Sequence, residues 1–163
     1  MQNAIHFHNL AQNFNTMSKV QAFYHIVIST YCRKFAFPID QMEPLFRFIT
    51  KILKDNNCVL HRINGMEDHI HMLIELNPNI ALAELMRTIK KESSQWISRT
   101  HIYPDFDGWC EGYGAFSCSY SVKDKVAKYI INQQEHHRQK TFDMEIEEMF
   151  RLANLQLHPN DFM

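Results

Sequence analysis

Glycine and proline are scarce in this chain of 163 residues, which contains four Gly and five Pro. Collagen-like and low-complexity architectures are therefore excluded. No run of about 18 apolar residues is present, so the sequence predicts no membrane span. The four cysteines lack CxxC spacing, which argues against a zinc or redox motif and indicates free thiols. The amino-terminal residues lack a basic stretch followed by an apolar run, so we expect no secretory signal and a cytoplasmic location.

The overall composition is that of a globular protein, with 45% hydrophobic and 21% charged residues. The length fits a single domain, which we place at 19–155 between an amino-terminal tail (1–18) and a carboxyl-terminal tail (156–163). The net charge of −1 argues against wholesale nonspecific binding of nucleic acid. Any affinity for nucleic acid must therefore come from local basic patches.

Hydrophobic periodicity predicts alternating strands and helices. β-branched and aromatic residues favour strands over 22–30, 58–64, 69–76 and 115–121, with a hairpin turn at 65–68. Apolar residues at helical spacing predict helices over 44–55, about 82–97, about 122–137 and about 143–154. The order β-α-β-β-α-β-α-α predicts an α+β fold: a ferredoxin-like split βαβ with an antiparallel sheet and additional C-terminal helices.

The first residues that can carry chemistry are His69 and His71, in the third predicted strand. Because strand side chains alternate between faces, both imidazoles point to one face and Ile70 points to the other. Two imidazoles on a rigid strand are suitable ligands for a divalent ion. The spacing alone is equally typical of two histidines on a solvated sheet face. The pair His6 and His8 has the same spacing but no predicted strand, so we expect no site there.

The second set lies on the predicted helix over 122–137. Tyr129 and Gln133 are four residues apart, so they share one helix face, beside the apolar stripe. Lys125 and either His136 or His137 extend this face as a polar stripe. An amphipathic helix with a boundary tyrosine is the ordinary alternative interpretation.

Taken together, the two sets indicate phosphoryl transfer. A phenol with a pKa near 10 is a poor nucleophile unless a cation stabilises the developing charge and a positioned group takes its proton. A metal held by His69, His71 and the amide oxygen of Gln133 leaves positions open for phosphate oxygens and water. Imidazole ligation favours Mn²⁺, whereas cellular abundance favours Mg²⁺. The sequence thus predicts a tyrosine that exchanges one phosphodiester for another.

Five segments together resemble one family: STYCRK (29–34), GMEDHIHMLIEL (65–76), IKKESSQWI (89–97), WCEGYGAFSCS (109–119) and YIINQQEHHRQKTF (129–142). The chain resembles the insertion-sequence-200-like transposases, the small single-tyrosine members of the HUH (His-hydrophobic-His) nuclease superfamily. The resemblance covers about residues 20–150. DHIHMLIEL followed by YIINQQEHH is the most specific part of it.

The resemblance implies a mechanism and a substrate. It implies that His69, His71 and Gln133 bind Mg²⁺ or Mn²⁺, and that Tyr129 attacks single-stranded DNA that carries imperfect hairpins. The products would be a 5′-phosphotyrosine link and a free 3′-hydroxyl. It also implies a homodimer in which the tyrosine helix can reach the partner's histidine pair. A site formed within one chain remains the alternative.

Further residues are expected to assist. We expect DNA contacts from basic residues after the first strand and on the second helix, namely Arg33, Lys34, Lys90 and Lys91. His136 or His137 is a guess for a proton shuttle, although partly exposed histidines at a helix end are common. Two other functions stay open: a domesticated relative that binds structured nucleic acid without cleaving it, and a metal-dependent hydrolase in which water attacks and Tyr129 only lines the site.

Overall fold

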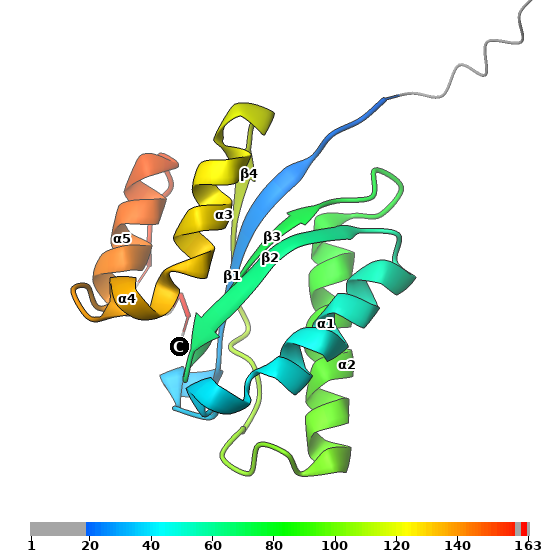
Figure 1. The fold of residues 1–163 in the computed structure, drawn as a ribbon, viewed down its shortest axis with the longest axis vertical. Coiled ribbons are helices and arrows are strands. Elements are labelled where there is room, and N and C mark those ends of the chain that lie inside the picture. Colours follow the sequence, from blue (N-terminus) through cyan, green and yellow to red (C-terminus); the bar gives the residue numbers. More distant parts are fainter. Residues whose placement is uncertain (1–18, 159–160, 163) are drawn as a thin grey trace, which may run out of the picture.

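One antiparallel sheet with helices on both faces makes up the computed structural model, which describes residues 19–158 and 161–162 (Figure 1). Along the chain the main elements are β1 (Phe23–Ser29), α1 (Glu43–Asp55), β2 (Val59–Met66), β3 (His69–Glu75), α2 (Leu82–Thr100), β4 (Gly114–Cys118), α3 (Lys123–Ile131), α4 (Gln133–His137) and α5 (Phe142–Leu152). The α+β, ferredoxin-like prediction is confirmed. Within the described residues, no helix is long and apolar enough to cross a membrane.

The strands lie in the order β2-β3-β1-β4, so β3 and β1 are the central strands. β3 is buried along almost its whole length because helices cover it on both faces. Ile70 and Met72 point into the larger core, towards α1 and α2. His69 and His71 point to the opposite face, as the period of two requires. The central strand therefore separates the hydrophobic core from the histidine pair.

The larger core forms between the sheet, α1 and α2. Leu45 and Ile49 of α1 and Leu85 and Ile89 of α2 are fully buried there against the even-numbered residues of β3. Apolar residues at helical spacing give each helix one continuous buried stripe. This layer fixes the sheet from one side and leaves its other face to α3, α4 and α5.

A second, smaller core lies on that other face. Val27 of β1 packs with Phe142 and Ile146 of α5 and with Phe162 near the carboxyl end. Phe162 belongs to the segment predicted as a C-terminal tail, yet its ring is buried. The predicted amino-terminal tail falls outside the described residues, and the domain bounds remain a prediction.

The single helix predicted over 122–137 is wrong, because the structure has two helices there. α3 ends at Ile131 and α4 begins at Gln133, with Asn132 between them at φ −90° and ψ 16°. The carbonyl oxygen of Ile131 accepts a hydrogen bond from Nδ2 of Asn64 at 2.9 Å, which stabilises the break. A side chain of β2, distant in sequence, thus interrupts a helix that its own periodicity would continue.

The β2–β3 hairpin is tighter than predicted. β2 runs on to Met66, so only Glu67 and Asp68 form the turn. Gly65 allows this, because a Cβ atom there would lie 2.3 Å from the backbone oxygen of His69. The short turn delivers Asp68 and His69 to the same end of the sheet.

Candidate active site

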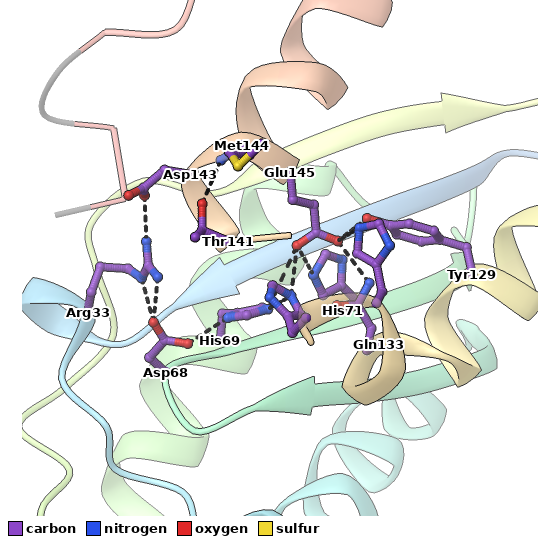
Figure 2. Close-up of polar contacts among 12 residues, drawn as sticks. Arg33, Asp68, His69, His71, Tyr129, Gln133, Thr141, Asp143, Met144 and Glu145 are labelled. Atoms are coloured by element: carbon purple, nitrogen blue, oxygen red, sulfur yellow. Dashed lines mark hydrogen bonds and ion pairs between the residues drawn. The ribbon is translucent and has the colours of Figure 1, made fainter. Parts of the chain in front are cut away.

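Four side chains with metal-binding atoms meet on the sheet face covered by α3, α4 and α5. His69 and His71 come from β3, His137 from α4 and Glu145 from α5, and one ligand atom from each lies within 4.8 Å of all the others. Figure 2 shows the labelled members of this cluster pointing toward the Glu145 carboxylate. The site therefore depends on three elements that are separated in sequence.

Each histidine of the β3 pair is oriented by a partner on its Nδ1 atom. Nδ1 of His69 lies 2.6 Å from Oδ1 of Asp68, and Nδ1 of His71 lies 2.9 Å from Nε2 of His25 in β1. When Nδ1 carries the proton and donates it, the lone pair stays on Nε2. Partners of this kind fix the tautomer and the ring orientation of metal-binding histidines. The Nε2 lone pairs of both rings are thus directed away from these partners and available to a cation, although Nε2 of His69 also lies 3.1 Å from Nε2 of His137.

Arg33 ties α5 to the start of β3. Its Nη2 lies 2.6 Å from Oδ2 of Asp68 and its Nη1 lies 3.0 Å from Oδ1 of Asp143, while the guanidinium sits 3.8 Å from the centroid of the Phe142 ring. Figure 2 shows Arg33 between the two carboxylates. The Phe142 ring also contacts His69, with 4.3 Å between centroids. Arg33 therefore holds the beginning of α5, and with it Glu145, over the histidine pair.

The two oxygens of Glu145 face different groups. Oε1 accepts a hydrogen bond from the Tyr129 hydroxyl and another from Nε2 of Gln133 at 2.9 Å. Oε2 lies 3.0 Å from Nε2 of His137 and 3.5 Å from Nε2 of His71. One oxygen is therefore directed at the phenol and the other at the imidazoles.

Burial shifts the protonation equilibria of the cluster toward neutral forms. Loss of solvation raises the pKa of Glu145 to about 8 and lowers the pKa of His25 and of His137 to about 4. Burial also holds the pKa of His71 well below its usual range. These imidazoles are therefore neutral at neutral pH, the state in which a ring nitrogen can bind a metal.

Unsatisfied polar atoms in the site fit a divalent cation. Nε2 of His71, Oε1 of Gln133 and Oε2 of Glu145 are buried and have no hydrogen-bond partner among the residues that the structure describes. Buried polar atoms are almost always paired, and leaving one unpaired costs roughly 1–3 kcal/mol. Nε2 of His71 and Oε2 of Glu145 belong to the cluster that could hold a metal ion, and one cation there would satisfy both. Imidazole nitrogen together with carboxylate and amide oxygen suits a first-row divalent ion.

Tyr129 and Gln133 lie beside the histidine pair, despite the break between α3 and α4. The Tyr129 ring is 6.1 Å from the His71 ring and 5.8 Å from the His25 ring, centroid to centroid. Gln133 is fully buried and reaches Glu145 from the first position of α4. The structure thus brings the predicted metal ligands and the predicted nucleophile together within one chain.

Glu145 and His25 belong to the site but were not predicted from sequence. Glu145 stands on the apolar face of α5, three residues after Phe142 and next to Ile146. An acidic residue inside a buried stripe was the available signal. His25 alternates with Val27 on the strand and thus shares its face, but its contact with His71 depends on how β1 and β3 pair.

The two predicted proton-shuttle residues occupy different positions. His137 joins the metal-binding cluster, with its Nε2 atom 3.1 Å from that of His69. His136 packs against Tyr129, with 5.1 Å between ring centroids, and its Nε2 atom lies 3.9 Å from Oε1 of Glu145. His136 is therefore the one closer to the phenol.

The residues predicted to contact DNA are largely engaged elsewhere. Lys90 donates hydrogen bonds to three backbone carbonyl oxygens, those of Cys110, Glu111 and Gly112. It lies on α2, which covers the face of the sheet opposite to Tyr129. Lys91 is exposed on the same helix. Lys34 forms an ion pair with Asp107 at 2.9 Å, and Arg33 is paired as described above. Their contacts with DNA stay predictions.

Known proteins resemble this chain in sequence and in fold. The family model described as "Transposase IS200 like" matches residues 18–133. Transposases for insertion sequence element IS200 from Salmonella typhimurium and Salmonella typhi are each 27% identical over 120 residues, which is 71% of this chain and 78% of the relative.

Two solved structures share the fold. A protein from Deinococcus radiodurans that is assigned as a transposase has a TM-score of 0.57 at 20% identity, covering 75% of this chain and 98% of its own. A REP-associated tyrosine transposase bound to a REP hairpin has a TM-score of 0.58 at 13% identity, covering 93% of this chain and 92% of its own. With the family model matching most of the chain, the protein belongs to the IS200-like transposases.

Proposed function

We propose that this transposase cleaves and rejoins single-stranded DNA by attack of Tyr129 on a phosphodiester, assisted by Mg²⁺ or Mn²⁺. One observation carries the proposal. The Tyr129 hydroxyl donates a hydrogen bond to Oε1 of Glu145, while Oε2 of the same carboxylate faces the imidazoles of His71 and His137. A nucleophile and a cation site that share one carboxylate are suited to phosphoryl transfer.

The chain's own residues supply the proton transfers. Glu145 would be ionised once a cation is held at Oε2, because binding releases the proton that burial otherwise keeps on this carboxyl at neutral pH. Its carboxylate then takes the proton of the Tyr129 phenol as the phenol oxygen bonds to phosphorus, and the bond from phosphorus to the 3′-oxygen breaks. His136, which lies 3.9 Å from the same carboxylate oxygen, is placed to pass that proton on to the departing 3′-oxygen. The products are a 5′-phosphotyrosine link and a free 3′-hydroxyl. Rejoining reverses these transfers, with a 3′-hydroxyl as the attacking group.

His69, His71, Gln133 and Glu145 would hold the cation. Its contribution would be to withdraw charge from the non-bridging phosphate oxygens. Asp68 and His25 keep the two ring nitrogens directed at that position, which lowers the reorganisation needed when the cation binds.

The hairpin-bound relative supports DNA with hairpin ends as the substrate, and a cytoplasmic location is part of the same proposal. We also propose that the protein acts as a homodimer. The proximity of Tyr129 to His71 in one chain supports a site completed within each subunit. A site shared between subunits is the competing arrangement.

The proposal is tested with end-labelled single-stranded DNA that carries the genomic flanks of this gene, incubated with Mn²⁺ and resolved on a denaturing gel. We expect a covalent protein–DNA adduct that is absent for Tyr129→Phe, which removes one oxygen from a half-buried ring. Cleavage without an adduct would instead indicate a hydrolase. Binding without cleavage would indicate a domesticated binder. Duplex DNA of the same sequence should be a poor substrate.

A further inference from the structure

Two large aromatic side chains are exposed on the loop that follows β1, residues 30–37, hereafter the β1 loop. Phe35 is 71% exposed and Tyr31 is 55% exposed. Single exposed apolar residues are ordinary on protein surfaces. Two exposed aromatic rings on one short loop, which also carries the Arg33 that contacts Asp68 in the site described above, require a more specific explanation.

The β1 loop is bonded to the turn that leads directly into His69. The backbone N–H of Thr30 donates to the carbonyl oxygen of Asp68 at 2.8 Å, and the N–H groups of Ala36 and Phe37 donate to that of Glu67 at 2.8 and 3.0 Å. Figure 1 shows the loop in pale blue at the end of the sheet where β2 ends. A strand of DNA that reaches the histidine pair from this side would pass over the loop.

The backbone of the β1 loop, which exposes the two rings, is held in a constrained conformation. Cys32 and Arg33 are consecutive non-glycine residues with φ of 50° and 56°, a conformation that side chains disfavour. The hydroxyl of Thr30 donates to the carbonyl oxygen of Lys34 at 2.7 Å, and the N–H of Tyr31 donates to that of Gly108 at 2.8 Å. Strain of this kind persists where the surroundings hold it, often at ligand contacts.

Charge on the loop argues for stacking over phosphate pairing. Arg33 is paired with Asp68 and Asp143, and Lys34 is paired with Asp107. Little free positive charge therefore remains beside the rings. Base stacking on aromatic side chains needs no such charge, and it tolerates any base because every base has a π face.

We propose that Phe35 and Tyr31 stack the unpaired nucleobases of single-stranded DNA next to the site. This inference rests on the proposed function, because it takes its substrate from it. The rings hold the strand in register with Tyr129, and they contribute affinity that does not depend on base sequence.

The test uses the full chain carrying Tyr129→Phe, so that DNA is bound but not cleaved, and a fluorescein-labelled dT20 oligonucleotide followed by anisotropy. We expect Phe35→Ala and Tyr31→Ala each to weaken binding about tenfold. Phe35→Trp should bind at least as tightly as the parent, whereas Phe35→Leu should be weakened. The matched control is Leu152→Ala, since Leu152 is also 71% exposed but ends α5 far from the loop.

Two further measurements separate stacking from other causes. The slope of log affinity against log salt should be unchanged in Phe35→Ala, because no phosphate contact is lost. When 5-iododeoxyuridine replaces thymidine, irradiation should cross-link the DNA to the peptide that contains Phe35. Circular dichroism melting of each variant verifies the fold.

The outcomes distinguish the two proposals. If the parent binds dT20 and both alanine variants bind it equally well, the stacking proposal is wrong and the proposed function stands. If the parent does not bind single-stranded DNA, both are wrong. If the alanine variants leave DNA affinity unchanged but lower the mass measured by light scattering, the rings contact a second copy of the chain instead.

Discussion

Replacing Glu145 by glutamine should stabilise the metal-free protein while it destroys the site. Burial raises the pKa of this carboxyl from 4.5 to about 8. Between these two pH values the unfolded chain releases a proton that the folded chain keeps, so the stability of the native state falls as the pH rises through this window. Each pKa unit corresponds to about 1.4 kcal/mol, which gives a cost of up to about 3 kcal/mol at pH 7.

Glu145→Gln removes this cost, since the amide cannot ionise, and it keeps an oxygen that can accept from Tyr129. Urea denaturation in EDTA should therefore find the variant more stable than the parent by up to about 3 kcal/mol at pH 7 and equal to it near pH 4. Adding Mn²⁺ should stabilise the parent but not the variant. Adduct formation should fall about a hundredfold or more, because the proton acceptor is lost.

Two results would refute this reasoning about Glu145. One is a variant that is less stable than the parent by the same amount at every pH, which would mean that the carboxyl acts only through packing and hydrogen bonds. The other is an Mn²⁺-induced stabilisation that survives the substitution, which would place the cation away from Oε2.

Three further experiments test the rest of the site. His69→Ala with His71→Ala should abolish Mn²⁺ binding in calorimetry, and unchanged binding would move the metal site elsewhere. Asp68→Asn should weaken Mn²⁺ binding about 10- to 100-fold, because the substitution alters the group that orients His69 while leaving the histidine pair in place. An unaltered Mn²⁺ affinity would mean that the contact between Asp68 and His69 is only structural. Mixing Tyr129→Phe subunits with the double histidine variant should give no adduct when the site lies within one chain, whereas a label on the histidine-variant chain would demonstrate a shared site.

Local patterns in the sequence predicted much of the fold and part of the site. The alternation in β3 predicted that His69 and His71 share a face, because a period of two depends only on neighbouring residues. The spacing of Tyr129 and Gln133 predicted a common direction, and both do reach Glu145.

What the sequence could not predict depends on contacts between distant segments. The helix break at Asn132 is stabilised by Asn64, a residue of β2. Glu145 enters the site because α5 docks through Phe142, whose ring lies beside His69. No local period encodes either contact.

The central claim, that Tyr129 is the nucleophile, is tested most directly by mass spectrometry of the covalent adduct. Single-stranded DNA labelled at its 3′ end is cleaved in Mn²⁺, the protein is digested with protease and nuclease, and the modified peptide is sequenced. We expect a nucleotide joined through its 5′-phosphate to Tyr129, with the 3′ label retained on the protein. A nucleotide on any other residue, or cleavage that leaves the protein unmodified, would contradict the proposed mechanism.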